Sequence, residues 1–391
     1  MTPRVAKTIS KFYTAAGDIS DEAKNTFEYL FLKFKKGIYI RITDSVLTFV
    51  PFCNKYYTNE WHRNIKVPEE FYKRYTRVLP KSKWHANNAI FKFHPNSGDM
   101  NGVDILFDMF QAVCNHTPGI YFEGFVNKRD HPILRTDRCE PYTYIFPELT
   151  PLVSYSHDSY SPILSMCSGV KGYDDILIPT WNDWANVSDK VFRNSRKTTV
   201  VTKMDKLFTS AVFRGSSTGF QVDDTNPRIR ISMMDLSEKR KKNGDLYLDA
   251  GITYWNERPR FTKDGSIVWI SQSLIDNIPL KKELTLEEQA DYRYIVTIDG
   301  HTSAYRLTSE LGTGSVLLLV DSPYRLWIHE YLTPWVHYAP ISSDLSDLYE
   351  TIDYLDERPE LRCEMVRNAL EVFHTRIHKK GILEKMIQTL H

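Results

Sequence analysis

The sequence lacks long apolar runs. Its first residues, "MTPRVAKTISKFYTAAGD", contain no apolar stretch of signal-peptide length. No later segment approaches the ~20 apolar residues that a membrane-spanning helix requires. These absences predict a cytoplasmic protein with no membrane span.

Paired cysteines and the common cofactor fingerprints are also missing. The five cysteines are scattered and form no CxxC pair, which predicts reduced thiols and no zinc cluster. The absence of GxGxxG and GxxxxGK[ST] excludes a Rossmann dinucleotide fingerprint and a P-loop. The only DxD-like candidate is "VDDTN" (222–226), so we predict neither a bound metal nor a resident cofactor.

Charge of one sign is not in excess either. The formal net charge of the 391 residues is +1, which gives no global attraction to nucleic acid or to an anionic membrane. Apolar residues make up 42% and charged residues 25%, as in ordinary globular proteins. The length predicts two or three domains, and any anion site has to be local.

The arrangement of apolar residues along the sequence changes near residue 190. Before it, segments with helical spacing alternate with strand-like segments, and an aromatic-rich stretch (140–186) follows that predicts loops with short elements. After it, four apolar runs end in Gly, Asp or Ser, with helical candidates between them: "KLFTSAVFRG", "RYIVTIDG", "GSVLLLVDS" and "WVHYAPIS". Runs without alternation predict strands buried on both faces, hence a parallel sheet with helical crossovers.

We therefore predict an α/β protein of two doubly wound units that face a cleft. The expected boundaries are an N-terminal domain over 1–190 and a C-terminal domain over 191–371. A last helix, from about 358 to 388, is expected to pack back on the first domain through residues 372–391.

One carboxylate of the first unit follows a predicted strand. "GIYFEGFV" (119–126) is rich in β-branched and aromatic residues, and "NKRDHPIL" comes directly after it, so Asp130 lies where a strand gives way to a loop. Ligands of open α/β sheets bind at that edge. Lys128 and Arg129 are expected to favour the ionised carboxylate, but a solvated loop acid is the ordinary alternative.

Three motifs of the second unit are suited to an anion. In "FRGSSTG", a strand ends in Arg214 and Gly215, and Ser216 opens a run of hydroxyl residues that can donate to an anion beside backbone N–H groups. In "NPRIRI", Arg228 and Arg230 alternate with Ile and offer planar forks for phosphate. A plain polar turn and a surface arginine pair are the alternatives.

The third motif is "IDGHTSAYRLTSELGTGS" (298–315). A strand, a glycine turn and a helix over 303–311 form a phosphate-binding geometry, because first-turn N–H groups are unpaired and the helix dipole is positive there. Arg306, one turn into this helix, is placed to reach the same anion. Together the three motifs favour a diphosphate at the second unit, opposite Asp130, and hence glycosyl transfer from a nucleotide sugar.

Five motifs, in order, resemble glycosyltransferase family 90: "NKRDHP", "PTWNDW", "FRGSSTG" with "NPRIRI", "DGHTSAYRL" and "LTPWVHYAPISSDLSDL". This family includes the Rumi-type protein O-glucosyltransferases and the fungal capsule-associated xylosyltransferases. The resemblance covers roughly residues 120–375, and residues 1–110 match nothing that we can name. In having these motifs without a leader, the sequence resembles family members encoded by large DNA viruses and some algae.

The resemblance implies a GT-B architecture of two Rossmann-like domains, a UDP-sugar donor, inversion at the anomeric carbon and no required metal. It makes Asp130 the catalytic base, with His131 in the place of the family's aromatic residue. It assigns the donor to two loops and one intervening arginine, Arg228, with Arg230 as the register alternative. The loop residues are Arg214, Ser216, His301, Thr302, Ser303, Ala304, Tyr305 and Arg306.

The acceptor side is less defined. Asp174, Asp175 and Trp181 lie in the aromatic-rich stretch, and aromatic faces beside carboxylates are common sugar-binding surfaces. The resemblance implies a hydroxyl acceptor on a glycan or protein, and glucose or xylose as the sugar. The "SST" after "FRG" departs from Rumi itself and argues against a Rumi-like donor preference. The missing leader makes an epidermal-growth-factor-like acceptor unexpected. The alternative function is a catalytically inactive binding protein of the same fold.

Overall fold

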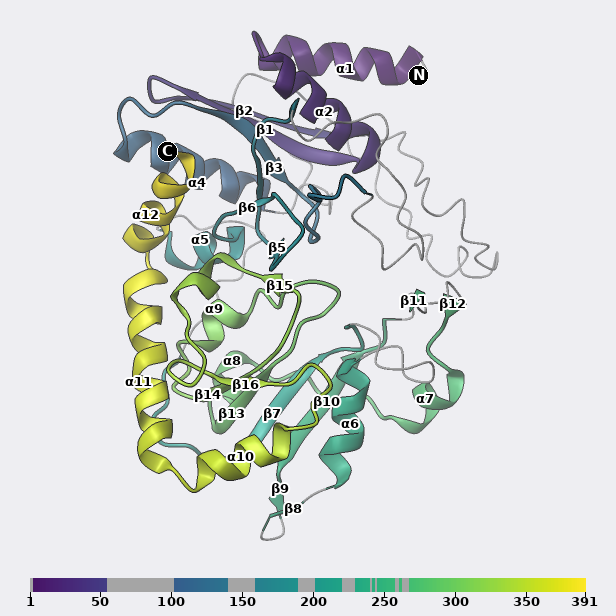
Figure 1. The fold of residues 1–391 in the computed structure, drawn as a ribbon, viewed down its shortest axis with the longest axis vertical. Helices are drawn as coiled ribbons and strands as arrows, with labels where there is room; N and C mark the ends of the chain where they lie inside the picture. The colour runs from purple at the N-terminus through teal and green to yellow at the C-terminus, as the bar shows by residue number, and fades with distance from the viewer. Residues whose placement is uncertain are drawn as a thin grey trace. The chain divides into compact units, whose positions relative to one another are not determined.

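The computed structural model describes nine stretches of the chain: residues 3–54, 102–139, 159–188, 201–219, 229–239, 241–242, 245–256, 260–261 and 267–391. Its residues divide into two compact units. Unit 1 comprises Met1–Ala185, Asp189–Ser195 and Leu383–His391, and unit 2 comprises Asn186–Ser188 and Arg196–Ile382. Each unit carries a five-stranded sheet with helices, so the predicted α/β class is confirmed (Figure 1).

The sheet of unit 1 is mixed rather than fully parallel. Its strand order is β2 (Val46–Cys53), β1 (Lys36–Thr43), β3 (Phe122–Asn127), β4 (Ile163–Ser165) and β6 (Ile176–Leu177). The β1–β2 and β1–β3 pairs are antiparallel, whereas β3–β4 and β4–β6 are parallel. The antiparallel part corrects the prediction of a doubly wound first unit.

A two-residue turn explains this difference. Asp44 and Ser45 join β1 to β2 with φ values of 49° and 65°. Positive φ at both central residues is the geometry of the hairpin turn that matches the twist of antiparallel strands. Aspartate tolerates this conformation better than most residues, but without glycine the hairpin signal in the sequence is weak.

The described part of unit 1 contains five further elements. They are α1 (Pro3–Ala16), α2 (Asp21–Lys33), α4 (Val103–His116), β5 (Ser168–Gly169) and α5 (Trp181–Val187), whose last residues fall in unit 2. Ser20 caps α2 by accepting a hydrogen bond from the amide of Ala23 at 3.1 Å. The core is aromatic, with Phe12 stacked on Phe27 at 3.6 Å between ring centroids.

The main sheet of unit 2 is parallel throughout. Its order is β10 (Leu248–Tyr254), β7 (Phe208–Ser216), β13 (Tyr292–Thr297), β14 (Val316–Val320) and β16 (Ala339–Ile341). Three of the four apolar runs that the sequence marked as strands form β7, β13 and β14, and the fourth contributes β16 at its end. The prediction of a parallel sheet after residue 190 is confirmed.

The other elements of unit 2 are short, apart from the helices that enclose the sheet. They are α6 (Ile229–Lys239), β8 (Lys241–Lys242), β9 (Asp245–Leu246), β11 (Arg260–Phe261), β12 (Ile267–Val268), α7 (Gln272–Asn277), α8 (Leu286–Gln289), α9 (Leu307–Glu310), β15 (Tyr324–Arg325), η4 (Trp327–Tyr331), α10 (Leu348–Asp356) and α11 (Pro359–Arg376). Apolar side chains of α6, α10 and α11 complete the core of this sheet.

The single last helix that the sequence predicts is two helices. α11 ends at Arg376 and α12 (Lys379–Leu390) follows after two residues, with Leu383–His391 belonging to unit 1 (Figure 1). Ile377, between them, has φ −91° and ψ 58°, which is not helical, and its amide donates to the carbonyl of Phe373.

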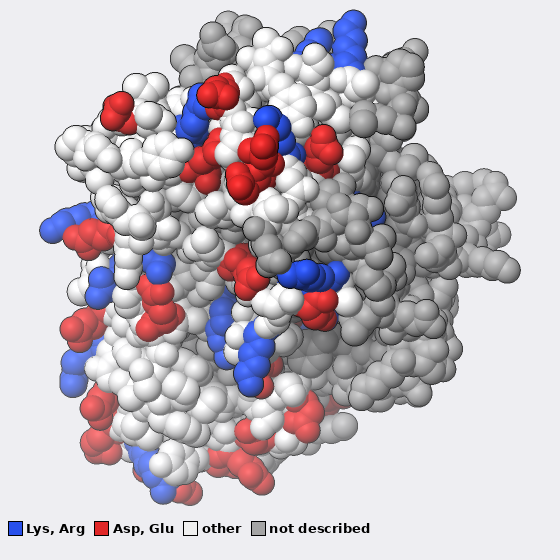
Figure 2. Space-filling view, turned by 45° about the horizontal axis from the view of Figure 1, so that its top comes forward, with Lys and Arg blue, Asp and Glu red and all other residues white. Residues whose placement is uncertain are grey.

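The described surface carries mixed charge. On the face drawn in Figure 2, basic and acidic side chains lie interspersed. No helix of the described residues is long and apolar enough to cross a membrane. All five cysteines lie in described segments, and none forms a disulfide.

Candidate donor and acceptor sites

The strand order of unit 2 creates a topological switch point. In chain order the sheet runs 2-1-3-4-5, because the chain leaves β7, forms β10 on one side, and then places β13 on the other. The loops that follow β7 and β13 therefore leave the sheet in opposite directions. Ligands of open α/β sheets bind in the crevice at the carboxyl ends of such a strand pair.

Arg230 ties the two loops together. From the first turn of α6, its guanidinium donates to Oγ1 of Thr218 at 2.8 Å and to the carbonyls of Ser216, Ile298 and Asp299 at 3.4, 2.6 and 3.1 Å. These bonds use four of its five N–H groups. Burial, followed by the nearby charge of Arg306, lowers the pKa of Arg230 to about 9.

The backbones at this junction approach closely. A Cβ at Gly300 would lie 2.9 Å from Oγ1 of Thr218 and 3.5 Å from Nη2 of Arg230. Glycine removes this clash and lets the two loops meet. The bonds of Arg230 indicate that it shapes the junction, while Arg228, the other predicted diphosphate ligand, lies outside the described residues.

Arg306 lies beside this junction and keeps donors unused. Its Nη1 donates to the carbonyl of Arg214 at 2.8 Å, and its Nε lies 2.8 Å from Oε1 of Glu310 in an ion pair. Its guanidinium also lies over the Phe213 ring, 5.3 Å from the centroid. The side chain is 30% exposed, and within the described residues no hydrogen bond engages Nη2.

Glu310 is the buried partner that orients Arg306. Its carboxylate has 1% of its side-chain surface exposed and accepts a hydrogen bond from the hydroxyl of Thr297 at 2.6 Å. Burial raises the pKa of Glu310, and Arg306 opposes this shift. Glu310 thus acts on Arg306 from inside the fold.

The helix predicted over 303–311 is shorter and begins later. α9 starts at Leu307, so Arg306 precedes the helix instead of lying one turn into it. The partly buried carboxylate of Asp299 accepts the amide of Ala304 at 2.6 Å, and the amide of Gly300 donates to the carbonyl of Thr302. These bonds hold residues 299–304 in a turn, which corrects the prediction of a helix N-terminus there.

The remaining predicted donor residues lie along these two loops. Ser216 ends β7 partly exposed, with Oγ 3.4 Å from Oγ1 of Thr218. His301, Thr302 and Tyr305 are partly exposed. Ser303 and Ala304 are buried, at 7% and 9% exposure.

Arg214 has a different place from the predicted one. Its Nη2 donates to Oδ2 of Asp249 at 2.8 Å, and its Nη1 donates to the Asp249 carbonyl at 2.7 Å. The same carboxylate accepts from Lys281 and Tyr292. Asp249 pairs with Val212 in the strand register, two residues before Arg214, so the guanidinium points back from the carboxyl edge. This direction argues against the predicted donor contact, which stays a prediction.

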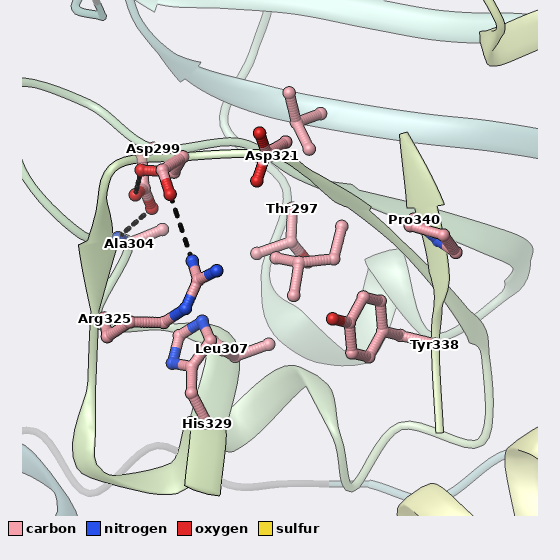
Figure 3. Close-up of a pocket in the computed structure, with 12 residues that line it drawn as sticks. Thr297, Asp299, Ala304, Leu307, Asp321, Arg325, His329, Tyr338 and Pro340 are labelled. Atoms are coloured by element: carbon pink, nitrogen blue, oxygen red, sulfur yellow. Dashed lines mark hydrogen bonds between the residues drawn. The ribbon is translucent and has the colours of Figure 1, made fainter. Parts of the chain in front are cut away.

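A small pocket lies farther along the same edge, beyond the ends of β13 and β14 and beside β16. Its volume is about 50 Å³, and Asp299 and Ala304 form part of its wall. Figure 3 shows Arg325 and His329 on one side and Tyr338 on the opposite side, with its hydroxyl directed inward. The sequence reading missed these three residues, although "DSPYRLWIH" directly follows a predicted strand.

The predicted base is carried by the corresponding edge of unit 1. Asp130 is exposed, three residues beyond the end of β3, where β3 pairs in parallel with β4. Asn127, the last residue of β3, is buried and donates to the carbonyl of His131 and to Oγ of Ser165, while its oxygen accepts from the amide of Arg129. A buried amide thus fixes the turn that presents Asp130.

Asp175 fixes the segment that follows. Its buried carboxylate accepts from the amides of Ile133 and Leu134 and from the hydroxyl of Ser165. Burial raises its pKa to about 6, against these hydrogen bonds. Asp175 supports the loop from inside, which argues against the predicted acceptor contact.

The other two acceptor candidates lie nearer the surface. Asp174 is exposed, and its amide donates to the carbonyl of Leu134 at 2.8 Å. Trp181 is partly exposed, and its ring occupies the position next to Gly102, where a Cβ would lie 2.5 Å from it. One part of this ring therefore serves packing against the start of α4.

A family model described as "Glycosyl transferase family 90" matches residues 122–391. The chain belongs to glycosyltransferase family 90. The match includes Asp130 and both loops of the switch point, so the resemblance inferred from the motifs is confirmed.

Relatives of this family member come from viruses and animals. It is 35% identical over 406 residues to uncharacterized protein 035R of Invertebrate iridescent virus 3, covering 94% of this chain and 36% of the relative. It is 25% identical to protein O-glucosyltransferase 1 of Rattus norvegicus, covering 53% of this chain and 50% of the relative. The chain thus spans about a third to a half of these relatives.

Among solved structures, HepE of Anabaena in complex with UDP is similar at a TM-score of 0.31 and 12% identity. The match covers 46% of this chain and 48% of that chain. A TM-score of this size supports no argument about fold or ligand.

Proposed function

We propose that this family 90 member is an inverting, metal-independent glycosyltransferase. It would move a sugar, glucose or xylose, from UDP-sugar to a hydroxyl group of a protein or glycan. The name of the rat relative, a protein O-glucosyltransferase, supports glucose and a protein acceptor. The iridescent-virus relatives support a viral source.

The partly exposed guanidinium of Arg306 at the switch point carries the donor half of this proposal. It has unused donors where a parallel sheet binds ligands, and two neighbouring elements hold it in place. Arginine forms bidentate, charge-assisted hydrogen bonds with phosphate oxygens. Ser216 adds a hydroxyl at the end of β7.

Asp130 carries the acceptor half. Its carboxylate would accept the proton of the acceptor hydroxyl as that oxygen attacks the anomeric carbon in line, which inverts the configuration. The transition state is oxocarbenium-like, and negative charge develops on the departing UDP. Fixed donors at Arg306 and Ser216 would stabilise that charge without reorganising.

A metal ion is the usual alternative for stabilising a leaving diphosphate. Within the described residues no group of three or more His, Cys, Asp or Glu side chains is arranged to hold one. The segment "VDDTN" (222–226) lies entirely outside the described residues. Metal independence therefore stays a prediction, to be tested with a chelator.

The deciding experiment measures UDP release from a panel of UDP-sugars by the full chain, with and without EDTA. Wild type is compared with Asp130→Asn and Arg306→Ala. We expect release from one or two sugars, insensitivity to EDTA and loss in both variants. Tight UDP binding without any release from any donor or added acceptor would instead identify an inactive binding protein.

A further inference from the structure

The pocket of Figure 3 is lined by hydrogen-bond donors that the proposed mechanism does not use. Nη1 of Arg325 donates to the carbonyls of Ser322 and Tyr324, both at 3.0 Å. Within the described part of the chain, no hydrogen bond engages its other nitrogens or the hydroxyl of Tyr338. The polar groups that line the pocket are therefore available to a ligand (Figure 3).

The proton of His329 has a defined place. Nδ1 accepts a hydrogen bond from the amide of Leu326 at 3.0 Å, so this nitrogen carries no proton. The Leu326 carbonyl, 3.2 Å from Nδ1, already accepts the amide of His329 and needs no second donor. The neutral ring then carries its proton on Nε2, on the side away from that backbone.

The imidazole remains neutral near pH 7. Burial, and then the charge of Arg325, lowers the pKa of His329 to about 4. His329 consequently offers a single neutral donor, Nε2–H, and no positive charge.

The remaining lining residues disfavour an anion. Asp299 and Asp321 both contribute to the wall of the pocket. A phosphate placed there would approach two acidic side chains and a single guanidinium, that of Arg325, so negative charge is in excess. The pocket suits an uncharged group with hydrogen-bond acceptors.

The volume sets a limit on that group. About 50 Å³ is several times the roughly 10–15 Å³ that one water molecule needs, so the pocket has room for a few heavy atoms. The pocket therefore admits one edge of a planar ring rather than a whole nucleotide.

We propose that the pocket binds the pyrimidine edge of the nucleotide and that Nε2–H of His329 donates to O4 of uracil. His329 is then a specificity-determining residue, because cytosine presents an amino group at that position. Two facing donors leave both groups unpaired, so CDP binds more weakly than UDP. This inference rests on the proposed function, since it assumes a nucleotide donor at the switch point.

Calorimetric titration of UDP and CDP into the full chain tests it. His329→Asn keeps an oxygen that can accept the amide of Leu326, but its shorter side chain withdraws the donor from the pocket. We expect UDP affinity to fall about three- to tenfold, with the UDP preference over CDP moving toward one. His329→Gln, whose amide reaches farther, should restore part of that preference.

Two controls separate this role from others. His374→Asn, on the exposed surface of α11, should change neither affinity. Arg306→Ala should weaken UDP and CDP equally, because both carry the diphosphate. An unchanged UDP preference in His329→Asn, or an equal loss for both nucleotides, would overturn the assignment.

The same titrations distinguish the inference from the function on which it rests. If wild type binds neither nucleotide, both fail. If UDP binds and Arg306→Ala weakens it while His329→Asn keeps the wild-type preference, only the pyrimidine assignment fails. If His329→Asn raises KM for UDP-glucose without weakening UDP, the pocket holds the sugar and the assignment is wrong.

Discussion

The loop after β3 in unit 1 and the loops at the switch point of unit 2 use buried polar groups in different ways. In unit 1, neutral Asn127 and buried Asp175 bind the backbone from inside, and exposed Asp130 is presented outward. In unit 2, a buried cation, Arg230, does the holding, and a second arginine is left partly exposed. In both regions, side chains with several backbone partners determine shape, whereas reactivity is expected from the more exposed neighbour.

The largest expected effect comes from removing the reactive group of unit 1. Asp130→Asn should lower transfer by on the order of 10²–10⁴, because an amide cannot accept the proton of the acceptor hydroxyl. UDP affinity, measured by calorimetry, should remain near that of wild type. The matched control is Asp44→Asn, an exposed acid in the β1–β2 turn. More than a tenth of wild-type turnover in Asp130→Asn would remove Asp130 as the base.

A change in pH should reach the supporting side of the same loop. His131 is buried, and burial lowers its pKa from 6.5 to about 4. Above pH 6.5 both the folded and the unfolded imidazole are neutral. Between pH 6.5 and 4 only the unfolded chain gains the proton, so stability falls by about 3 kcal/mol as the pH falls through this window.

His131→Phe, the aromatic type that the family motif places there, should abolish that loss. Urea unfolding of wild type and variant at pH 7 and pH 4.5 measures the difference in the free energy of unfolding. His116→Gln, which changes an exposed histidine of α4, should keep the wild-type pH dependence. The buried-histidine account is wrong if wild type and His131→Phe lose the same stability on acidification.

Arg214 of β7 and Arg306, which directly precedes α9, sharpen the comparison within unit 2. Arg306→Ala should weaken UDP binding about ten- to hundredfold, which corresponds to the roughly 1.5–3 kcal/mol of a charge-assisted hydrogen bond. Arg306→Lys should restore only part, since lysine lacks the planar fork. Arg214→Ala should lower thermal stability and leave UDP affinity within about threefold. Calorimetry and thermal unfolding would contradict this division if the two alanine variants exchanged their effects.

Chelation is expected to have no effect. Activity should survive EDTA because fixed donors at Arg306 and Ser216 replace a metal in stabilising the diphosphate. The measurement is the initial rate of UDP release with EDTA and after adding Mn²⁺. Loss with EDTA and recovery with Mn²⁺ would move attention to the acids of "VDDTN".

The sequence was most informative where an apolar run and the residues that end it both indicate a buried strand. Apolar runs ending in Gly, Asp or Ser located β7, β13 and β14, and motif order identified the family. It was least informative where a tertiary partner decides. Nothing local indicates that Arg214 turns back to Asp249, or that Asp299 takes the amide of Ala304 and delays α9.

The same limit explains the other corrections. Asp174 and Asp175 are chemically identical neighbours, yet one is exposed and the other is buried beneath the loop of residues 133 and 134. The antiparallel β1–β2 pair depends on positive φ at Asp44 and Ser45. Glycine at these positions would have predicted this turn from the sequence, whereas Asp and Ser do not.

The missing side chain at Gly300 has a consequence for how the donor loops can change. A methyl group there would contact both Thr218 and Arg230. The loops after β7 and β13 are therefore so close that neither can gain a larger side chain at this point alone. A longer loop or a bulkier residue after one strand therefore requires a compensating change in the loop after the other strand. Changes in donor preference are expected to arise as paired substitutions across 214–219 and 298–306. Exchanging a single residue between family members at this junction should often abolish donor binding.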